Sequence, residues 1–368
     1  MRNGRNLLGM AQLTLERGPI RVGSHRTGVA ITGLATAVPA VRVDTNEVWT
    51  ALARLRGRGL RHRPAPTDGS RTRYFAEPLE AVVERRSQSQ QTDAYVKHAR
   101  ILSRQVAADA LERSGVDRDS IGLVIGVSCT GVILPSLDAE LIPQLGLRAD
   151  VARLPITELG CGGGVAGLAR AQDYLRAYPD RAVLLFAVEL PSLTFQPDDR
   201  SADNLIAAMV FGDGAGGAVL QAGDASPGWV IEQSGSVLVP EGARQLGYEL
   251  RDGGLRVVLS RELPGVVQAH LRGVVDAFLE RAELRLSDLD FIAAHPGGSR
   301  IFDAIERSLG LDADALAASR AVFANVGNPS SAGIFFVLEA IRPARPSRGL
   351  AIAFGPGLSI ELALMRFQ

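Results

Sequence analysis

The sequence predicts an α/β protein of two duplicated βαβαβ-type halves, stacked as five layers of helix and sheet in the order αβαβα. Apolar, β-branched runs alternate with stretches of helical periodicity, which is typical of α/β layers. One segment from Asp109 ("DALERSGVDRDSIGLVI") and another from Asp276 ("DAFLERAELRLSDLDFI") run in parallel with one inserted residue, which indicates an internal duplication. The length of 368 residues also exceeds the usual size of a single core, so we expect two fused half-domains.

The expected elements follow from local patterning. Apolar, β-branched runs predict buried strands at 29–32, 122–127, 183–188, 218–220, 291–294 and 351–354. Apolar residues at helical spacing predict helices at 99–112, 266–278, 301–309 and 334–341. Because strands alternate with helices, we expect one largely parallel central sheet in each half. The glycine-rich stretch "FGDGAGGAVL" from Phe211 precedes no helix, so we expect a tight turn into a strand rather than a phosphate-binding loop.

The expected domain boundaries place an N-terminal half at 28–222 and a C-terminal half at 223–368. Residues 1–27 are rich in arginine, with Glu16 as their acidic residue, and lack the apolar core of a secretion signal. We expect them to form a disordered N-terminal extension, upstream of a possible start at Met10. A transit peptide is the alternative interpretation.

The composition excludes several classes of protein. Forty basic and forty acidic residues cancel, so no global field attracts nucleic acid or a membrane. The two cysteines do not form a disulfide framework, which fits a reducing cytoplasm. The sequence has no metal-binding motif and no apolar stretch of the roughly 18 residues that a membrane-spanning helix needs. We therefore expect a cytoplasmic protein without a metal.

Three polar residues follow a strand or a glycine at positions that the duplication relates. Cys161 lies in "ELGCGGGVAGLARA" and Asn328 lies in "NVGNPSSAGIFFVLEA", 167 residues later. His295 directly follows a predicted strand, and the same offset carries it back to Ser128, beside Cys129. If the two halves face one another, Cys161, His295 and Asn328 meet near the shared axis.

These residue types suit attack on a carbonyl carbon and stabilisation of an enolate oxygen. A cysteine at a helix start lies near the positive end of the helix dipole, which favours the nucleophilic thiolate. The glycines that follow Cys161 leave backbone N–H groups accessible to an oxyanion. A neutral His295 and Asn328 are suited to stabilising the enolate that forms when a carboxylate leaves as carbon dioxide. For an isolated cysteine, a buried structural thiol is the usual alternative.

The segment from Arg54 to Gln91 mixes arginine with glycine and proline, and we expect a partly ordered surface segment there. Its arginines have two explanations. They form a solvated face, or they bind a phosphate-bearing ligand, since guanidinium groups bind phosphate bidentately.

Four ordered motifs carry a resemblance to a known family. From about residue 28 to the end, the chain resembles the type III polyketide synthases, the chalcone and stilbene synthase-like enzymes of the thiolase fold. The matching motifs are "GCGGGVAGLARA", "HPGG", "GNPSSA" and "FGPGLSIE", and "SCTGVILPSLDAELI" resembles the bacterial members. The resemblance implies the thiolase fold and a homodimer.

The resemblance also implies roles for individual residues. Cys161 matches the nucleophile that accepts the acyl group, and His295 and Asn328 match the pair that promotes malonyl decarboxylation. Phe211 matches the gatekeeper between the CoA tunnel and the cavity. The remaining matches line the substrate cavity, at Cys129, Thr194, Gly254, Gly298 and Ser330, or bind CoA, at Arg54, Arg58 and Arg61. For Phe211 a core aromatic is the alternative, and for Cys129 an inert core thiol.

The implied activity is iterative, decarboxylative condensation of malonyl-CoA onto a starter acyl group on Cys161, followed by cyclisation to a pyrone or a resorcinol or other phenolic product. The substrates are CoA thioesters, and no cofactor is expected. We favour an aliphatic or fatty acyl starter, giving an alkylpyrone or alkylresorcinol. Two alternatives stay open: an initiating ketoacyl synthase of fatty acid synthesis, which condenses once, and a non-catalytic acyl-CoA-binding homologue.

Overall fold

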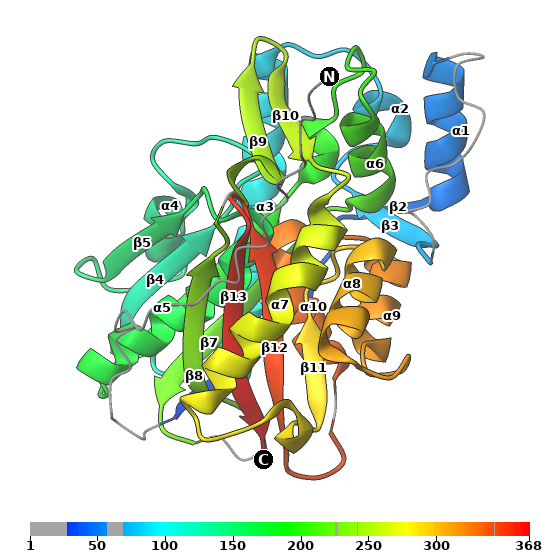
Figure 1. Cartoon of the computed structure of the whole chain (residues 1–368). Helices are drawn as coiled ribbons and strands as arrows, with labels where there is room; N and C mark the ends of the chain where they lie inside the picture. Colours follow the sequence, from blue (N-terminus) through cyan, green and yellow to red (C-terminus); the bar gives the residue numbers. More distant parts are fainter. Residues whose placement is uncertain (1–27, 57–68, 225–226, 241, 342) are drawn as a thin grey trace, which may run out of the picture.

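A computed structural model describes residues 28–56, 69–224, 227–240, 242–341 and 343–368. Nine of the described strands form one hydrogen-bonded sheet, which crosses the molecule in Figure 1. In spatial order these strands are β11 (Phe291–Ala294), β12 (Ser347–Gly355), β13 (Ser359–Phe367), β8 (Trp229–Leu238), β1 (Val29–Ala37), β7 (Gly214–Ala222), β6 (Ala182–Glu189), β4 (Ile121–Val127) and β5 (Ala152–Ile156). All six predicted strands are present, several of them longer than expected.

The sheet has two portions with a short link. β1 pairs with β7 along its whole length but with β8 only over Val29–Ile31. On one side of this link lie β5, β4, β6, β7 and β1, and on the other lie β8, β13, β12 and β11. The two sheets that the duplication predicts are therefore joined by three residue pairs.

The expectation of largely parallel sheets is wrong. The β4–β5, β4–β6 and β11–β12 pairs are parallel, whereas β1–β7, β6–β7, β12–β13, β13–β8 and β1–β8 are antiparallel. β12 and β13 show the reason. Only a tight turn separates their ends at Gly355 and Ser359, and so short a connection allows antiparallel pairing alone.

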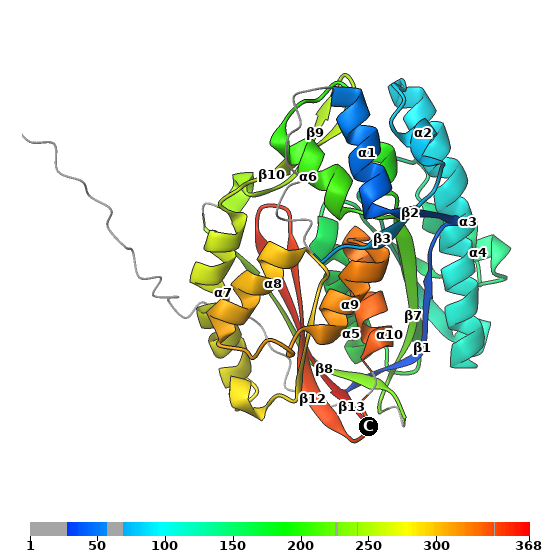
Figure 2. The same cartoon turned by 90° about the vertical axis from the view of Figure 1, so that its right-hand side faces the viewer.

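Helices cover both sheet portions and fill the space between them, as Figure 2 shows. The central layer contains α5 (Gly163–Ala177) and α10 (Gly333–Ala340), and their apolar residues share one core with strands of both portions. α3 (Gln88–Ser114) packs on the outer face of one portion, and α7 (Leu263–Glu280) and α8 (Ser299–Leu309) pack on the outer face of the other. The five-layered αβαβα arrangement is confirmed, as are the four predicted helices.

The duplicated segments have the same local structure. α3 is followed by the short 3₁₀ turn Arg118–Ser120 and β4, and α7 is followed by the turn Leu286–Asp288 and β11. β4 and β11 end 167 residues apart, but α5 and α10 begin 170 residues apart. Cys161 and Asn328 are therefore not equivalent positions, because Asn328 lies three residues further from the start of its helix.

The remaining elements lie mainly at the end of the molecule that is uppermost in Figure 1. They are β2 (Val41–Asp44), α1 (Thr45–Arg56), β3 (Thr72–Phe75), α2 (Leu79–Val82), α6 (Ala202–Val210), β9 (Leu246–Arg251) and β10 (Gly254–Leu259), together with α4 (Leu137–Gln144) and α9 (Ala317–Val326) elsewhere. The predicted surface segment from Arg54 to Gln91 thus contains β3, whose Arg73 is fully buried.

Three further expectations concern residues 1–27, the boundary between the halves and membrane-spanning helices. Residues 1–27 lie outside the described residues. The boundary at 222/223 falls between β7 and β8 and stays a prediction. No helix in the described part of the chain is both long enough and apolar enough to cross a bilayer.

Candidate active site

Cys161 lies in the 3₁₀ turn Gly160–Gly162, directly before α5. The glycines around it let the C-terminal half come close. A Cβ atom at Gly164 would lie 2.2 Å from the carbonyl oxygen of Ser331, and one at Gly162 would lie 3.2 Å from the Cα of Gly355. The sequence "GCGGG" therefore brings the nucleophile into contact with elements of the other half.

His295 follows β11 and is 3% exposed. Its backbone N–H donates to the carbonyl of Ile352 at 2.8 Å, which continues the parallel pairing of β11 with β12. A Cβ atom at Gly333 would lie 3.0 Å from Nδ1, so the imidazole faces the start of α10. Neither ring nitrogen has a hydrogen-bond partner of good geometry among the described residues.

Asn328 lies between α9 and the 3₁₀ turn Ser330–Ala332 and is 4% exposed. Its N–H donates to the carbonyl of Val210 at 3.0 Å, and its carbonyl accepts from Gly212 at 3.1 Å, which forms a parallel bridge beside Phe211. Its Oδ1 accepts from the N–H of Ser330 at 2.8 Å. Because the oxygen is engaged there, the Nδ2 group is the side of the amide available as a donor.

One cavity of about 90 Å³ brings the three residues together. Cys161, His295 and Asn328 all line it, and Phe211 and Gly298 lie in the same wall. Much of the remaining lining is apolar, at Ile206, Val210, Leu246, Leu259, Leu263 and Phe354. A buried, mostly apolar cavity with a few convergent polar groups is the usual form of a small-molecule site.

Phe211 directly follows α6 and lines two cavities. Besides the cavity that contains Cys161, its ring lines a second one of about 30 Å³, which Thr194 also lines. The predicted turn is present, since β7 begins at Gly214. The structure thus places the predicted gatekeeper at a boundary between two spaces.

Burial controls the protonation of the nucleophile and the imidazole. Burial lowers the pKa of His295 to about 3, against the smaller opposite effect of Asn328. Burial also raises the pKa of the Cys161 thiol to about 11, against the lowering effects of Ser330 and Asn328. Burial therefore opposes the thiolate form that the helix start is expected to favour.

Ser330 and Cys129 lie beside the nucleophile. The hydroxyl Oγ of Ser330 is 3.5 Å from the Sγ of Cys161 and 3.5 Å from the Sγ of Cys129. Ser330 has a φ of 45°, which is unfavourable for a residue with a side chain. The predicted cavity residues Cys129 and Ser330 are thus joined to Cys161 through one hydroxyl.

Glu189 is a member of this cluster that sequence reasoning missed. Its carboxylate, fully buried at the end of β6, accepts from the N–H of Cys129 at 3.1 Å and from the hydroxyls of Thr130 and Ser331. Burial raises the pKa of Glu189, against the lowering effects of these donors. The available signal was an acidic residue at the end of an otherwise apolar strand.

Tyr248, on β9, is a second missed residue. Burial raises the pKa of Tyr248, and electrostatic interactions with Cys129, Cys161 and Glu189 add to that effect, while the Thr194 hydroxyl opposes it. Its phenol therefore lies within electrostatic range of both thiols. Sequence reasoning passed over it because β9 was not predicted as a strand.

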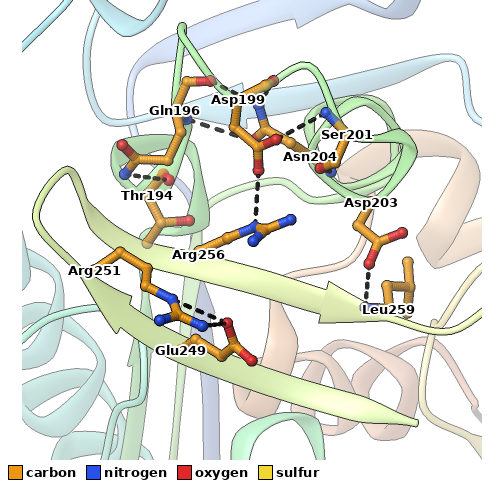
Figure 3. Close-up of polar contacts among 10 residues, drawn as sticks. All are labelled: Thr194, Gln196, Asp199, Ser201, Asp203, Asn204, Glu249, Arg251, Arg256 and Leu259. Atoms are coloured by element: carbon orange, nitrogen blue, oxygen red, sulfur yellow. Dashed lines mark hydrogen bonds and ion pairs between the residues drawn. The ribbon is translucent and has the colours of Figure 1, made fainter. Parts of the chain in front are cut away.

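The β9–β10 hairpin is fixed to the segment that leads into α6, as Figure 3 shows. Arg256 pairs with Asp199 at 3.3 Å, and the N–H of Leu259 donates to Asp203 at 3.1 Å. These contacts hold Leu246 and Leu259 in the wall of the reactive cavity. Gly254 has a φ of 119° and faces the side chains of Gln91 and Gln196, so it does not line that cavity.

Of the three predicted CoA-binding arginines, the structure describes Arg54, which lies in α1. Arg54 is exposed and lines a surface hollow with Arg42 and Glu47, apart from the reactive cavity. Arg58 and Arg61 fall outside the described residues. Among the residues that the structure describes, no group of three or more His, Cys, Asp or Glu side chains could hold a metal ion.

Comparison with known proteins agrees with this geometry. Residues 78–224 match the N-terminal domain of the chalcone and stilbene synthases, and residues 231–367 match their C-terminal domain. The chain is 36% identical over 366 residues to 1,3,6,8-tetrahydroxynaphthalene synthase of Streptomyces peucetius subsp. caesius, covering 95% of this chain and 97% of the relative. It is 32% identical over 355 residues to an alpha-pyrone synthesis polyketide synthase-like protein of Mycobacterium tuberculosis, covering 91% and 90% of the two chains.

A solved structure gives the same result. The crystal structure of 1,3,6,8-tetrahydroxynaphthalene synthase from Streptomyces coelicolor A3(2), described as a bacterial type III polyketide synthase, superposes with a TM-score of 0.86 at 30% identity. The match covers 92% of this chain and 99% of that one. The chain therefore belongs to the chalcone and stilbene synthase family and is a type III polyketide synthase, a transferase of the thiolase fold.

Proposed function

We propose that Cys161 carries the growing chain and that His295 and Asn328 stabilise the enolate formed from malonyl-CoA. The observation that carries this proposal is that the three side chains, from separate elements of the two halves, line one cavity. The resident groups supply one nucleophile and two neutral donors, which is the set that a decarboxylative condensation requires.

Loading begins with the Cys161 thiol. Its sulfur attacks the carbonyl carbon of a starter acyl-CoA, and the bond from that carbon to the CoA sulfur breaks. The thiol proton ends on the released CoA. Because burial lowers the pKa of His295, its imidazole is neutral at physiological pH and has one ring nitrogen able to accept a hydrogen bond from the thiol.

Extension begins when malonyl-CoA loses carbon dioxide. The electron pair of the broken carbon–carbon bond forms the enolate of acetyl-CoA, whose oxygen accepts hydrogen bonds from a ring N–H of His295 and from Nδ2 of Asn328. The enolate carbon attacks the Cys161 thioester, and the carbon–sulfur bond to Cys161 breaks. The lengthened acyl-CoA can return to Cys161 for another round.

For the substrate and product we propose an aliphatic or fatty acyl starter and a pyrone or resorcinol-type product. The apolar lining of the reactive cavity supports an aliphatic chain, and the alpha-pyrone name of the mycobacterial relative supports the ring. The tetrahydroxynaphthalene synthase names favour a second candidate, in which malonyl-CoA also supplies the starter. A naphthalene skeleton has ten carbons, which five two-carbon units provide.

A panel of acyl-CoA thioesters with isotope-labelled malonyl-CoA tests these candidates, with mass-spectrometric product analysis. A labelled ring product that retains the starter supports the aliphatic candidate, and a product made from malonyl-CoA alone supports the second. A linear product of one condensation would instead identify an initiating ketoacyl synthase. Absence of any new carbon–carbon bond would leave only an acyl-CoA-binding role.

We further propose that Arg54, Arg58 and Arg61 bind the phosphates of CoA, that the enzyme is a homodimer and that it acts in the cytoplasm without a cofactor. Phe211, with Cys129, Thr194, Gly254, Gly298 and Ser330, is proposed to shape the path of the chain. Charge reversal at Arg54 with Asp should raise the KM for malonyl-CoA and leave kcat largely unchanged, because phosphate binding is remote from the reacting atoms. An unchanged KM would remove Arg54 from the set.

A further inference from the structure

We propose that Arg73 is a positioning residue that holds Phe211 and Asn328 in their working places in the reactive cavity. The inference rests on the proposed function of Phe211 as gatekeeper and of Asn328 as a donor to the enolate. Arg73 itself does not line the cavity. It acts through the backbone on which both residues sit.

Arg73 is an arginine with no exposed surface, on the short strand β3. Its Nη1 donates to the carbonyl of Phe211 at 3.2 Å, with a longer contact of 3.4 Å to the carbonyl of Ala208. Its Nη2 donates to the hydroxyls of Thr45 at 2.9 Å and Ser70 at 2.8 Å. Burying a guanidinium group costs free energy unless hydrogen bonds satisfy its N–H groups. This arrangement therefore indicates a specific structural role for Arg73.

The two carbonyls that Arg73 contacts lie at the C-terminal end of α6. Carbonyl groups there lack partners within the helix and carry the negative end of its dipole. A cation at this place therefore fixes where α6 ends. It also fixes the backbone of Phe211, the first residue after the helix.

The stem of Arg73 packs under the two glycines that flank the functional residues. A Cβ atom at Gly212 would lie 3.0 Å from the Cβ of Arg73, and one at Gly327 would lie 3.4 Å from it. Gly212 follows Phe211 and Gly327 precedes Asn328. Arg73 thus touches both sides of the bridge that pairs Phe211 with Asn328.

The same bridge couples the two functional residues. Asn328 donates to the carbonyl of Val210, and Gly212 donates to the carbonyl of Asn328. A shift of the α6 end therefore moves the Phe211 ring and the Asn328 amide together. Cys161 lies on a different element, so its acylation should depend on Arg73 much less than condensation does, even though Asn328 also affects its thiol.

The test compares Arg73→Lys with wild type, with Arg348→Met as a control that removes an arginine paired with Glu232 on the sheet. Because a misplacement of about 1 Å can cost about a hundredfold in rate, we expect Arg73→Lys to lower kcat for condensation by about tenfold or more. Starter loading on Cys161, followed by mass spectrometry, should change by less than about threefold. A variant that loads and condenses at wild-type rates would overturn the proposal.

A double-mutant cycle separates positioning from a general loss of packing. If Arg73 acts through Phe211, Arg73→Lys should alter starter preference strongly in the wild-type background and by less than about twofold in the Phe211→Ala background. Equal effects in both backgrounds would overturn the proposal. If circular dichroism shows that Arg73→Lys does not fold, Thr45→Val takes its place in the same cycle with the same criteria. This change removes one hydrogen-bond partner of the Arg73 Nη2 group. Failure of wild-type enzyme to load Cys161 at all would instead refute the proposed function.

Discussion

The Oγ atom of Ser330 lies 3.5 Å from the Sγ atom of Cys161, although 169 residues separate them in the sequence. Ser330 belongs to the C-terminal half and Cys161 to the N-terminal half, so this contact marks where the two halves meet. The strained φ of 45° at Ser330 brings its hydroxyl to both cysteines. A residue of the other half is therefore placed to affect the pKa of the Cys161 thiol.

Replacing Ser330 should make Cys161 less reactive. Because the Ser330 hydroxyl lowers the pKa of the Cys161 thiol, Ser330→Ala should raise that pKa further and reduce the thiolate fraction at a fixed pH. We expect alkylation of Cys161 by iodoacetamide at pH 8 to slow by about two- to tenfold, measured by peptide mass spectrometry. An unchanged or faster rate in Ser330→Ala would show that the hydroxyl does not act on this thiol.

Replacing Cys161 should separate decarboxylation from condensation. Cys161→Ala removes the acyl acceptor, so polyketide output should fall below about a thousandth of the wild-type level. Release of carbon dioxide from malonyl-CoA should persist in part, because His295 and Asn328 are unchanged. Cys129→Ala is the matched control and should still form product; an active Cys161→Ala enzyme would contradict the assignment.

The pH dependence of that residual decarboxylation reports on His295. Its pKa of about 3 means that the imidazole stays neutral as the pH rises from 5 to 8, so its ability to donate does not change over this range. Carbon dioxide release by Cys161→Ala should therefore vary by less than about twofold between pH 5 and pH 8. A sigmoidal change centred near the ordinary histidine pKa would show that the imidazole titrates there.

Truncating Phe211 should alter selectivity more than stability. The ring already borders two cavities, so we expect Phe211→Ala to cost about 1–3 kcal/mol in unfolding free energy, less than a Phe→Ala change in a filled core. The range of accepted starters or the product length should change, as an acyl-CoA panel would reveal. If both the starter range and the products matched wild type, Phe211 would not be a gatekeeper.

The contact between the halves should be sensitive to a single methyl group. A Cβ atom at Gly164 would lie 2.2 Å from the backbone oxygen of Ser331, so Gly164→Ala should destabilise the fold by about 3 kcal/mol or more. Gly273, exposed on α7 with open space around it, is the control. Gly273→Ala should stabilise by about 0.5–1 kcal/mol in chemical denaturation, since alanine favours the helix. Equal stabilities for the two variants would contradict the packing described at Gly164.

The sequence predicted the secondary-structure elements that depend only on the local pattern of apolar residues. The apolar runs that became β4, β6 and β12 and the amphipathic helices α7 and α8 all follow from patterning. β13 was missed because the charged residue Glu361 interrupts an otherwise apolar run, although Glu361 is itself buried. Its carboxylate accepts from Ser236 at 2.9 Å, a contact with the neighbouring strand β8 that no local pattern reveals.

The residues of the candidate site also divide into those that local sequence patterns predicted and those that they did not. The duplication pointed to Cys161, His295 and Asn328 because each follows a glycine or a strand end. Glu189, Tyr248 and Arg73 stayed hidden because their environments come from distant segments. From the sequence alone, an acidic, phenolic or basic side chain is expected to be exposed to solvent. Only its contacts in the folded structure show that it lies in the interior.

Mass spectrometry of the acylated enzyme tests most directly whether Cys161 is the residue that carries the acyl group. After brief incubation with a starter acyl-CoA without malonyl-CoA, the mass of the acyl group should be added to the peptide that contains Cys161. The peptide that contains Cys129 should stay unmodified. An acyl group on Cys129, or no acyl group on either cysteine after incubation with the full starter panel, would contradict the account.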